Sequence, residues 1–341
     1  RLTAPGGVLD RLTQEDGGLM RAIEPGGLVD QLLDEEGLVE RVLAEDGLAD
    51  RLLAEGGLID KLTARNGPLE QLADVADTLN RLAPGLEALE PTIEALEGGL
   101  HVLCEKPMAA NATQVRQMLD AARGSGAFLM EAMWTRHLPV LRRLREWIDQ
   151  GRLGEIRTVE AAFGFSAPYQ PTNRLWSSEL AGGSLLDLGI YPLTLAELVF
   201  DCMPVSFEAE AELSASGVDS YLSLTAEFTG GGSAYLRSAL NADLSSTARV
   251  VGSAGVVEIP EFWRAERMVF DPVEGGRAEE VLEPHDINGF EYQILEAARC
   301  LEAGRSESAV VPWTWSLAMA ELTDEIRARI GVVYPSDDEL Q

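Results

Sequence analysis

The chain changes character near residue 100, and this change limits what each part can fold into. Residues 1–100 contain no Phe, Trp, Tyr, Cys or His, so all 9 Phe, 6 Trp and 6 Tyr lie beyond them. Glycine also recurs every ten residues from Gly7 to Gly67. A fixed period of this kind marks a repeat. We therefore expect residues 1–98 to form a segment of their own, distinct from an enzyme-like remainder.

Each copy of the repeat has the apolar pattern of a short helix. In one copy Leu48, Ala49, Leu52 and Leu53 share one face of about two helical turns. Over ten residues that stripe would drift by about 80° in a continuous helix. The repeat therefore predicts short acidic helices broken at the glycines. Such a segment can pack as a scaffold, associate with another chain or, least in keeping with its acidity, lie on a membrane surface.

Charge and cysteine content exclude several classes of partner. The net charge of -30 would repel a phosphate backbone, so we expect no nucleic-acid partner. The sequence has no run of about twenty apolar residues and no signal segment, which argues against a membrane partner. Cys104, Cys202 and Cys300 are odd in number and widely spaced, so neither disulfides nor a metal site is predicted. We expect a cytoplasmic protein.

Beyond the repeat, the pattern predicts an α/β protein in two parts. Residues 99–152 read as strand, helix, strand, helix, with strands at 101–104 and 127–134, which is half of a doubly wound Rossmann unit. Residues 153–341 alternate as strands of an open, mainly antiparallel sheet. The strands are expected at 158–165, 205–213, 221–228, 234–240 and 250–259, with late helices at 287–303 and 315–330.

Three residues in two separated motifs suggest acid and base chemistry. Lys106 follows the first predicted strand in Glu105-Lys106-Pro107, and Asp187 and Tyr191 lie four residues apart where a helix should begin. If Lys106 lies opposite, its ammonium would favour a phenolate, which can exchange a proton with a substrate hydroxyl or carbonyl. Alternatively, each residue has an ordinary structural role: a solvated turn lysine, a helix cap and a core tyrosine.

Five motifs in order resemble the glucose-fructose oxidoreductase, inositol dehydrogenase and rhizopine catabolism (Gfo/Idh/MocA) family, most closely its dihydrodiol dehydrogenase-like branch. The resemblance covers about residues 99–335. The motifs are HVLCEKPMAAN, FLMEAMWTRHLP, GEIRTVEAAFGF, NRLWSSELAGGSLLDLGIYP and PHDINGFEYQILEAARC.

The resemblance implies an NAD(P)-dependent oxidoreductase that transfers hydride on a sugar, polyol or dihydrodiol, and a dimer formed through the C-terminal sheet. By the same likeness Lys106 is the catalytic lysine, Tyr191 the acid/base and Asp187 the aspartate of the motif. Glu105, Lys106 and Pro107 would meet the nicotinamide end of NAD or NADP.

Four further residues are expected in the substrate pocket from the same resemblance. They are Trp134, Arg136, Phe163 and Phe290. The aromatic residues can instead be core, and Arg136 can instead pair with a nearby acid.

The chain departs from the family in one respect. No G-x-G-x-x-G spacing occurs in residues 1–99, although glycines at that spacing let backbone amides reach a dinucleotide pyrophosphate. We therefore expect weak cofactor binding and little turnover by this chain alone, unless another subunit supplies the dinucleotide site. The alternative is a non-catalytic structural or interaction protein that uses the repeat and the open sheet for association.

Overall fold

The computed structural model describes residues 89–340. The chain divides into two compact units, Arg1–Asp74 and Val75–Gln341, and every described residue belongs to the second. Of the repeat segment expected over residues 1–98, only helix α8 (Leu89–Glu97) is described. The predicted decapeptide helices from Gly7 to Gly67 lie outside the described residues.

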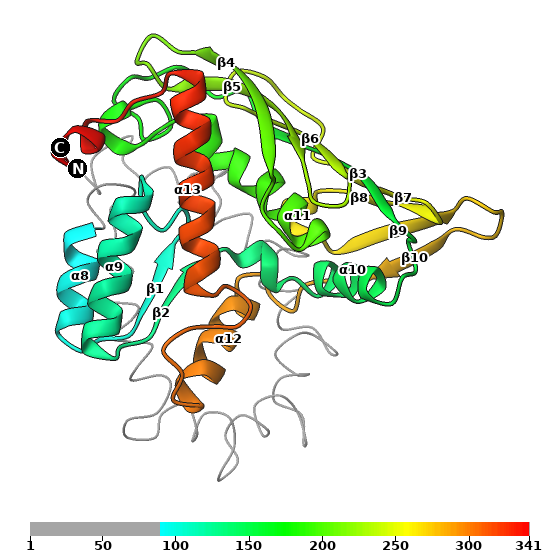
Figure 1. The fold of residues 1–341 in the computed structure, drawn as a ribbon, viewed down its shortest axis with the longest axis horizontal. Coiled ribbons are helices and arrows are strands. Elements are labelled where there is room, and N and C mark those ends of the chain that lie inside the picture. Colours follow the sequence, from blue (N-terminus) through cyan, green and yellow to red (C-terminus); the bar gives the residue numbers. More distant parts are fainter. Residues whose placement is uncertain (1–88, 341) are drawn as a thin grey trace, which may run out of the picture. The chain divides into compact units, whose positions relative to one another are not determined.

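A small parallel unit contains the first predicted strand and helix. Strands β1 (Val102–Glu105) and β2 (Leu129–Ala132) pair in parallel, and helices α8 and α9 (Ala112–Ser125) lie beside them (Figure 1). Asn111 begins α9 because its side chain accepts a hydrogen bond from the backbone N–H of Gln114 at 3.0 Å. The order strand, helix, strand agrees with the half Rossmann unit expected from the sequence.

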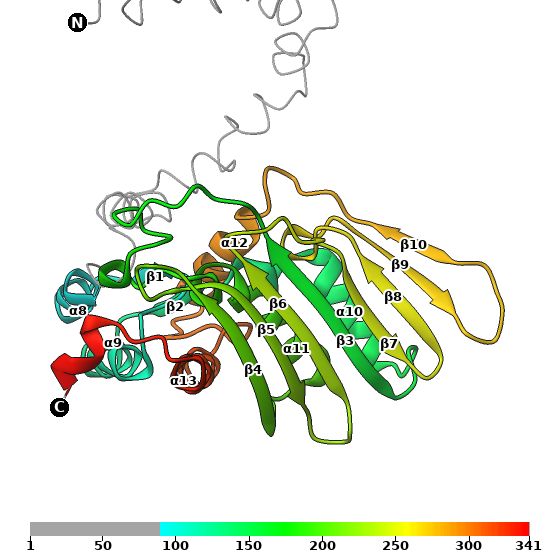
Figure 2. The ribbon, with the colours of Figure 1, turned by 90° about the horizontal axis from the view of Figure 1, so that it is seen from above.

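An eight-stranded sheet forms most of the rest, in the order β10-β9-β8-β7-β3-β6-β5-β4. All neighbouring strands are antiparallel except β3 and β6, which are parallel. Figure 2 shows the order of the strands. The strands are β3 (Ile156–Gly164), β4 (Ser206–Leu213), β5 (Asp219–Glu227), β6 (Ser233–Ala239), β7 (Ala248–Gly252), β8 (Gly255–Ile259), β9 (Arg267–Pro272) and β10 (Glu279–Leu282).

Two details of the predicted sheet were wrong. The single strand expected at 250–259 is a hairpin of β7 and β8, because the chain turns at residues 253–254. Strands β9 and β10 were not foreseen. Strand β10 has mostly exposed side chains and so lacks the alternating apolar pattern on which strand prediction depends. In β9 the buried Met268 and Phe270 flank the apolar Val269, so the alternation in burial is not visible in the sequence.

Helices cover one face of the large sheet. Helix α11 (Ile190–Phe200) packs on β3 and β6 and buries every residue except Glu197 and Phe200, as a core helix does. Helix α10 (Pro139–Asp149) is amphipathic and buries Leu141 and Leu144. Figure 2 shows α10 and α11 behind the strands.

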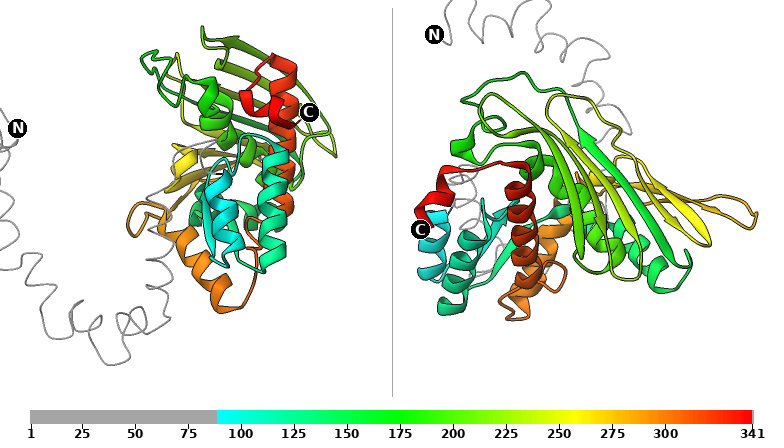
Figure 3. Two further views of the ribbon diagram at one scale, coloured as in Figure 1. Left: turned by 90° about the vertical axis from the view of Figure 1, so that its left-hand side faces the viewer. Right: turned by 45° about the horizontal axis from the view of Figure 1, so that its top comes forward.

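Helix α13 (Trp313–Ile330) joins the sheet to the parallel unit. It contacts both α9 and β4, and the indole N–H of Trp313 donates to the carbonyl of Leu129 on β2 at 2.8 Å. Its position between the two parts is visible in Figure 3. Helix α12 (Glu291–Glu302) precedes it, so the two late helices expected from the sequence are both present. Helix α13 thereby connects the parallel unit to the large sheet.

Candidate active site

Lys106, Asp187 and Tyr191 meet at the carboxyl end of β1. The ammonium of Lys106 donates a 2.7 Å hydrogen bond to the backbone carbonyl of Asp187 and lies 3.9 Å from its carboxylate Oδ1. The same nitrogen lies 4.8 Å from the centre of the Tyr191 ring. The side chains of Lys106 and Asp187 are only 12% and 16% exposed. A charged lysine so enclosed interacts strongly with the aspartate and with the electron-rich face of the phenol.

The backbone at Asp187 is not the regular helix start expected from the sequence. Residues Leu185–Gly189 form a π-helical turn, and α11 begins only at Ile190. A π-turn adds one residue to the helical ring, and such turns are frequent at functional sites. Here the carbonyl of Asp187 accepts the bond from Lys106 instead of serving only the helix. Asp187 and Tyr191 still reach the same lysine.

Arg174 is a partner of Asp187 that sequence reasoning missed. Its guanidinium donates to Asp187 Oδ1 at 2.7 Å, so the carboxylate lies between two cations, Arg174 and Lys106. Arg174 lies in the NRLWSSEL stretch, thirteen residues before Asp187. No spacing rule connects an arginine in a loop to a helix start, so only the resemblance of that stretch could have pointed to it.

Trp134 contacts the phenol oxygen of Tyr191 directly. Its indole N–H donates to Tyr191 Oη at 3.2 Å, and Tyr191 is 6% exposed. A buried N–H donor directed at a phenol oxygen stabilises negative charge on that oxygen. The expectation for Trp134 was a pocket wall; the structure adds a polar contact to the candidate acid/base.

Aromatic rings from four elements surround Tyr191. Phe163 on β3 packs edge to face on Tyr191 with ring centres 5.6 Å apart, and it stacks on Trp263 at 4.9 Å. Phe290 lies 4.5 Å from Trp134. Trp263 was not predicted, because it follows β8 in a short 3-10 helix that carries no motif. Together these rings form an apolar, aromatic wall beside the phenol.

Arg136 takes part in a different set of contacts. It forms an ion pair with Glu197 of α11, donates to the carbonyl of Val310 at 2.9 Å and lies over the Trp315 ring. These contacts use its charge to join the segment after β2 to α11 and α13. Two roles were expected for Arg136, a place in the substrate pocket or an ion pair with a nearby acid. The observed contacts are those of the ion pair.

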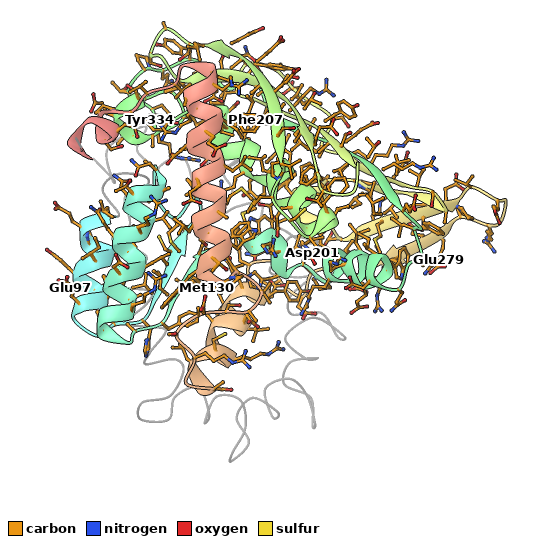
Figure 4. The ribbon with its side chains drawn as sticks, in the orientation of Figure 1. Glu97, Met130, Asp201, Phe207, Glu279 and Tyr334 are labelled. Carbon is orange, nitrogen blue, oxygen red and sulfur yellow. The ribbon has the colours of Figure 1, made fainter. Side chains whose placement is uncertain are left out.

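A buried carboxylate fixes the turn that begins the Asp187 segment. Asp219 on β5 accepts hydrogen bonds from Ser184 Oγ and from the backbone N–H of Leu185, both at 2.7 Å. Burial raises the pKa of Asp219 to about 6, although these bonds lower it. Tyr334, labelled in Figure 4, donates to the carbonyl of Gly182 at 2.6 Å. The turn is therefore held from the sheet and from the C-terminal segment.

The described residues fit one end of a nicotinamide dinucleotide. The Lys106–Pro107 peptide bond is cis and follows β1 directly, at the carboxyl end of a parallel strand, where ligands bind in doubly wound folds. Glu105 is exposed at that end and Lys106 and Pro107 are half-buried. No glycine-rich turn between a strand and a helix occurs among residues 89–340 to receive the pyrophosphate. Of the two ends of a dinucleotide, the described part of the chain could therefore contact only the end that lies at the carboxyl end of β1.

One helical stretch, Ser178–Phe200, is long and apolar enough to cross a membrane by composition. However, 89% of its most apolar window is buried inside the fold. It contains α11, and we interpret it as a core helix.

The fold and the site define an NAD(P)-dependent oxidoreductase. Residues 87–133 match the oxidoreductase family with an NAD-binding Rossmann fold, and residues 141–258 match the GFO/IDH/MocA C-terminal domain. The mouse trans-1,2-dihydrobenzene-1,2-diol dehydrogenase is 36% identical over 253 residues, which are 71% of this chain and 74% of that protein. The Xenopus laevis protein of the same name is 33% identical over 250 residues, 70% and 74% of the two chains. This chain belongs to the Gfo/Idh/MocA family.

Solved structures agree with this assignment. An aldose-aldose oxidoreductase from Caulobacter crescentus, complexed with glycerol, matches with a TM-score of 0.64 and 28% identity over 70% of this chain and 72% of that one. A 3-ketoreductase from Actinomadura kijaniata, in complex with NADP and TDP-benzene, also matches at 0.64, with 25% identity over 72% and 76%. The family and the expected cofactor class are thus confirmed.

Proposed function

We propose that Tyr191, Lys106 and Asp187 form the proton-transfer centre of this oxidoreductase. The observation that carries the proposal is the ammonium of Lys106 lying 4.8 Å from the Tyr191 ring while it binds the carbonyl of Asp187. Two groups favour negative charge on the phenol: the Lys106 ammonium and the indole N–H of Trp134 at 3.2 Å from Tyr191 Oη. Tyr191 Oη is the atom that takes the proton from a substrate hydroxyl or returns it to a carbonyl.

Each remaining residue has a supporting task in this centre. Asp187 holds the lysine close to the phenol, and Arg174 holds Asp187 by its 2.7 Å bond. Burial of Tyr191 among aromatic rings excludes water, which strengthens the charge interactions inside. Glu105, Lys106 and Pro107 would hold the nicotinamide end of NAD or NADP, which when bound supplies or accepts the hydride.

The aromatic wall supports a substrate with a flat or ring-shaped apolar face. Phe163 and Trp263 stack at 4.9 Å and stand beside Tyr191, and Phe290 extends the wall through Trp134. A dihydrodiol presents such a face together with hydroxyls for Tyr191, and a sugar presents C–H faces that also pack on aromatic rings. Of the proteins named above, two are dihydrodiol dehydrogenases by name, one is an aldose-aldose oxidoreductase and one is a 3-ketoreductase. We propose a dihydrodiol or sugar substrate.

Turnover with these two substrate classes tests the proposal. We expect NADPH or NADH formation when the wild-type protein oxidises trans-1,2-dihydrobenzene-1,2-diol or an aldose. Because the described residues contact only the nicotinamide end, saturation is expected at millimolar cofactor, and fluorescence titration with NADPH should give a Kd in the same range, corresponding to about -4 kcal/mol of binding free energy.

The two parts of this prediction fail separately. Absence of turnover with either class, at saturating cofactor, would contradict the proposed function. A micromolar Kd for NADPH or NADH would leave the function intact and show that the phosphates are held by residues not recognised in the sequence.

We further propose that the outer face of the large sheet is a contact between two copies of the chain. No helix within residues 89–340 covers that face in Figure 2. It carries a groove of about 410 Å³, and Tyr235 at its edge is 50% exposed. Acidic and basic side chains alternate there, so two copies related by a two-fold axis would be complementary. The charged residues of the groove are Glu160, Arg237, Arg249 and Glu258.

Sedimentation velocity tests this contact. The wild-type protein is expected to sediment as a dimer, and Tyr235→Glu is expected to shift it to monomer because it places a new charge on the proposed contact face. Leu213→Glu, at the end of β4 and outside the groove, is the matched control and should remain dimeric. A monomeric wild type would contradict the proposal.

The domain division and location are also proposals. Leu96 of α8 is buried in one cluster with Met118 and Leu119 of α9, so α8 belongs to the parallel unit. We propose that the repeat segment ends before Leu89, that the partial Rossmann unit runs to residue 152, and that residues 153–341 form the substrate and association domain. Three free cysteines support a reducing, cytoplasmic location.

A further inference from the structure

Glu131 is a buried carboxylate directly behind the lysine segment. It lies on β2, opposite Cys104 of β1 in the parallel register, and is only 2% exposed. Carboxylates are rarely so buried unless they hold a partner. Neither the motif reasoning nor the proton-transfer scheme above gives Glu131 a task.

The contact that Glu131 makes is with the segment that carries Lys106. Its Oε1 accepts a 3.0 Å hydrogen bond from the backbone N–H of Met108. Pro107 has no N–H, so this bond uses the first backbone donor after Lys106. The carbonyl of Met108 is held as well, by the thiol of Cys104 at 3.5 Å. The turn after β1 is thus fixed at both polar groups of Met108.

The Glu131 carboxyl group also changes its charge within the physiological range of pH. Burial raises the pKa of Glu131 from 4.5 to about 7, while the hydroxyl of Ser316 on α13, the Met108 N–H bond and the positive charges of Lys106 and Arg136 lower it. The other titratable group facing it is Cys104, whose thiol keeps its proton because burial raises its pKa to about 12. Above pH 7 Glu131 is therefore ionised and attracts the Lys106 ammonium; below pH 7 it is neutral and this attraction is lost.

We propose that Glu131 is a positioning residue for Lys106: its buried carboxylate fixes the Lys106–Met108 turn through the Met108 N–H and places a counter-charge behind the ammonium. The inference rests on the proposed role of Lys106 in proton transfer. It adds that Glu131 holds the segment that carries the lysine, through the Met108 N–H, while Asp187 contacts the ammonium itself. The state of Glu131 then sets how firmly the ammonium is held against the Tyr191 ring.

The lysine content of the chain allows a direct test that needs no cofactor or substrate. Lys61 and Lys106 are the only lysines in the sequence, so protein labelled with ¹³C and ¹⁵N in lysine gives two Cε–Nζ signals, and Lys106→Arg assigns them. ¹⁵N labelling of the eight methionines reports the Met108 amide, whose signal is assigned with Met108→Leu. In the wild type we expect the Lys106 signal and the Met108 amide proton to shift with one common midpoint near pH 7. The amide should move to lower frequency on acidification, because a neutral carboxyl is the weaker acceptor.

Glu131→Gln separates the contact from the charge. The amide oxygen of Gln can still accept from Met108, so the fold should persist, but the Lys106 inflection should disappear. Glu296→Gln is the control. It removes a carboxylate of α12 that accepts a hydrogen bond from Ser308, and the Lys106 signal of this variant should keep its inflection. A folded Glu131→Gln protein with an unchanged Lys106 titration would overturn the proposal. The proposal would also be overturned if the wild-type signals of Lys106 and Met108 had no common midpoint. This second measurement tests the proposal even if the variant does not fold. Because turnover is not measured, these outcomes are independent of the substrate and cofactor assays.

Discussion

Replacement of Tyr191 by phenylalanine is expected to lower turnover by about 10²–10⁴-fold, the usual contribution of a positioned general acid or base. The substitution removes only the hydroxyl. It keeps the ring against which Lys106 lies at 4.8 Å and on which Phe163 packs at 5.6 Å. The loss should appear in kcat, with little change in the substrate KM or in NADPH binding, because the aromatic wall and the nicotinamide contacts remain.

The control for this variant removes a phenol that lies outside the site. Tyr169→Phe changes an exposed tyrosine that packs on Trp176, so its kcat should equal that of the wild type. Retention of full activity by Tyr191→Phe would show that a different group transfers the proton.

Substitution of Gly183 by alanine is expected to have the largest effect on stability. Gly183 has φ +118°, which L-residues rarely adopt, and an added Cβ would lie 2.2 Å from the buried Asp219 Oδ1. Backbone strain and displacement of the carboxylate that holds Ser184 and Leu185 act together, so we expect a loss of about 3 kcal/mol in the free energy of unfolding. The turn that carries Asp187 would also shift, so activity should fall.

Gly217→Ala is the matched control for this change. Gly217 has φ +82°, also unfavourable for alanine, but nothing lies within 4 Å of an added Cβ. Only backbone strain remains, worth about 1–2 kcal/mol. Urea unfolding followed by tryptophan fluorescence measures both variants. If both variants lost the same free energy of unfolding, Asp219 would be able to move aside without destabilising the protein, and it would not fix the turn.

Local sequence patterns predicted the parts of the fold that depend on residues close together in the sequence. The apolar run before Lys106 became β1, and the two late helices appeared near their expected bounds. The pairing of β3 with β6 in parallel could not be foreseen, because it depends on where distant strands settle and not on the pattern of either strand. The π-turn at Leu185–Gly189 has the same apolar content as an α-helix start, so sequence periodicity does not distinguish the two.

The candidate site divides in the same way. The family resemblance brought together Lys106, Asp187 and Tyr191, and their contacts are present in the structure. Trp263 escaped prediction because it lies in a short helix that carries no motif, and Arg174 because no spacing rule connects an arginine within a motif loop to an aspartate thirteen residues later. Tertiary packing brings such residues to the site, and the spacing of residues in the sequence does not reveal these contacts.

The most direct test of the central claim, that Lys106 and Tyr191 act as one unit, is a double-mutant cycle on kcat with Lys106→Met and Tyr191→Phe. If the ammonium acts by stabilising charge on the phenol, removing the phenol hydroxyl leaves it nothing to stabilise. The double variant should then be no slower than the slower single variant. Losses that multiply, so that the double variant falls by the product of the two single effects, would show that the two residues act independently and would contradict the account.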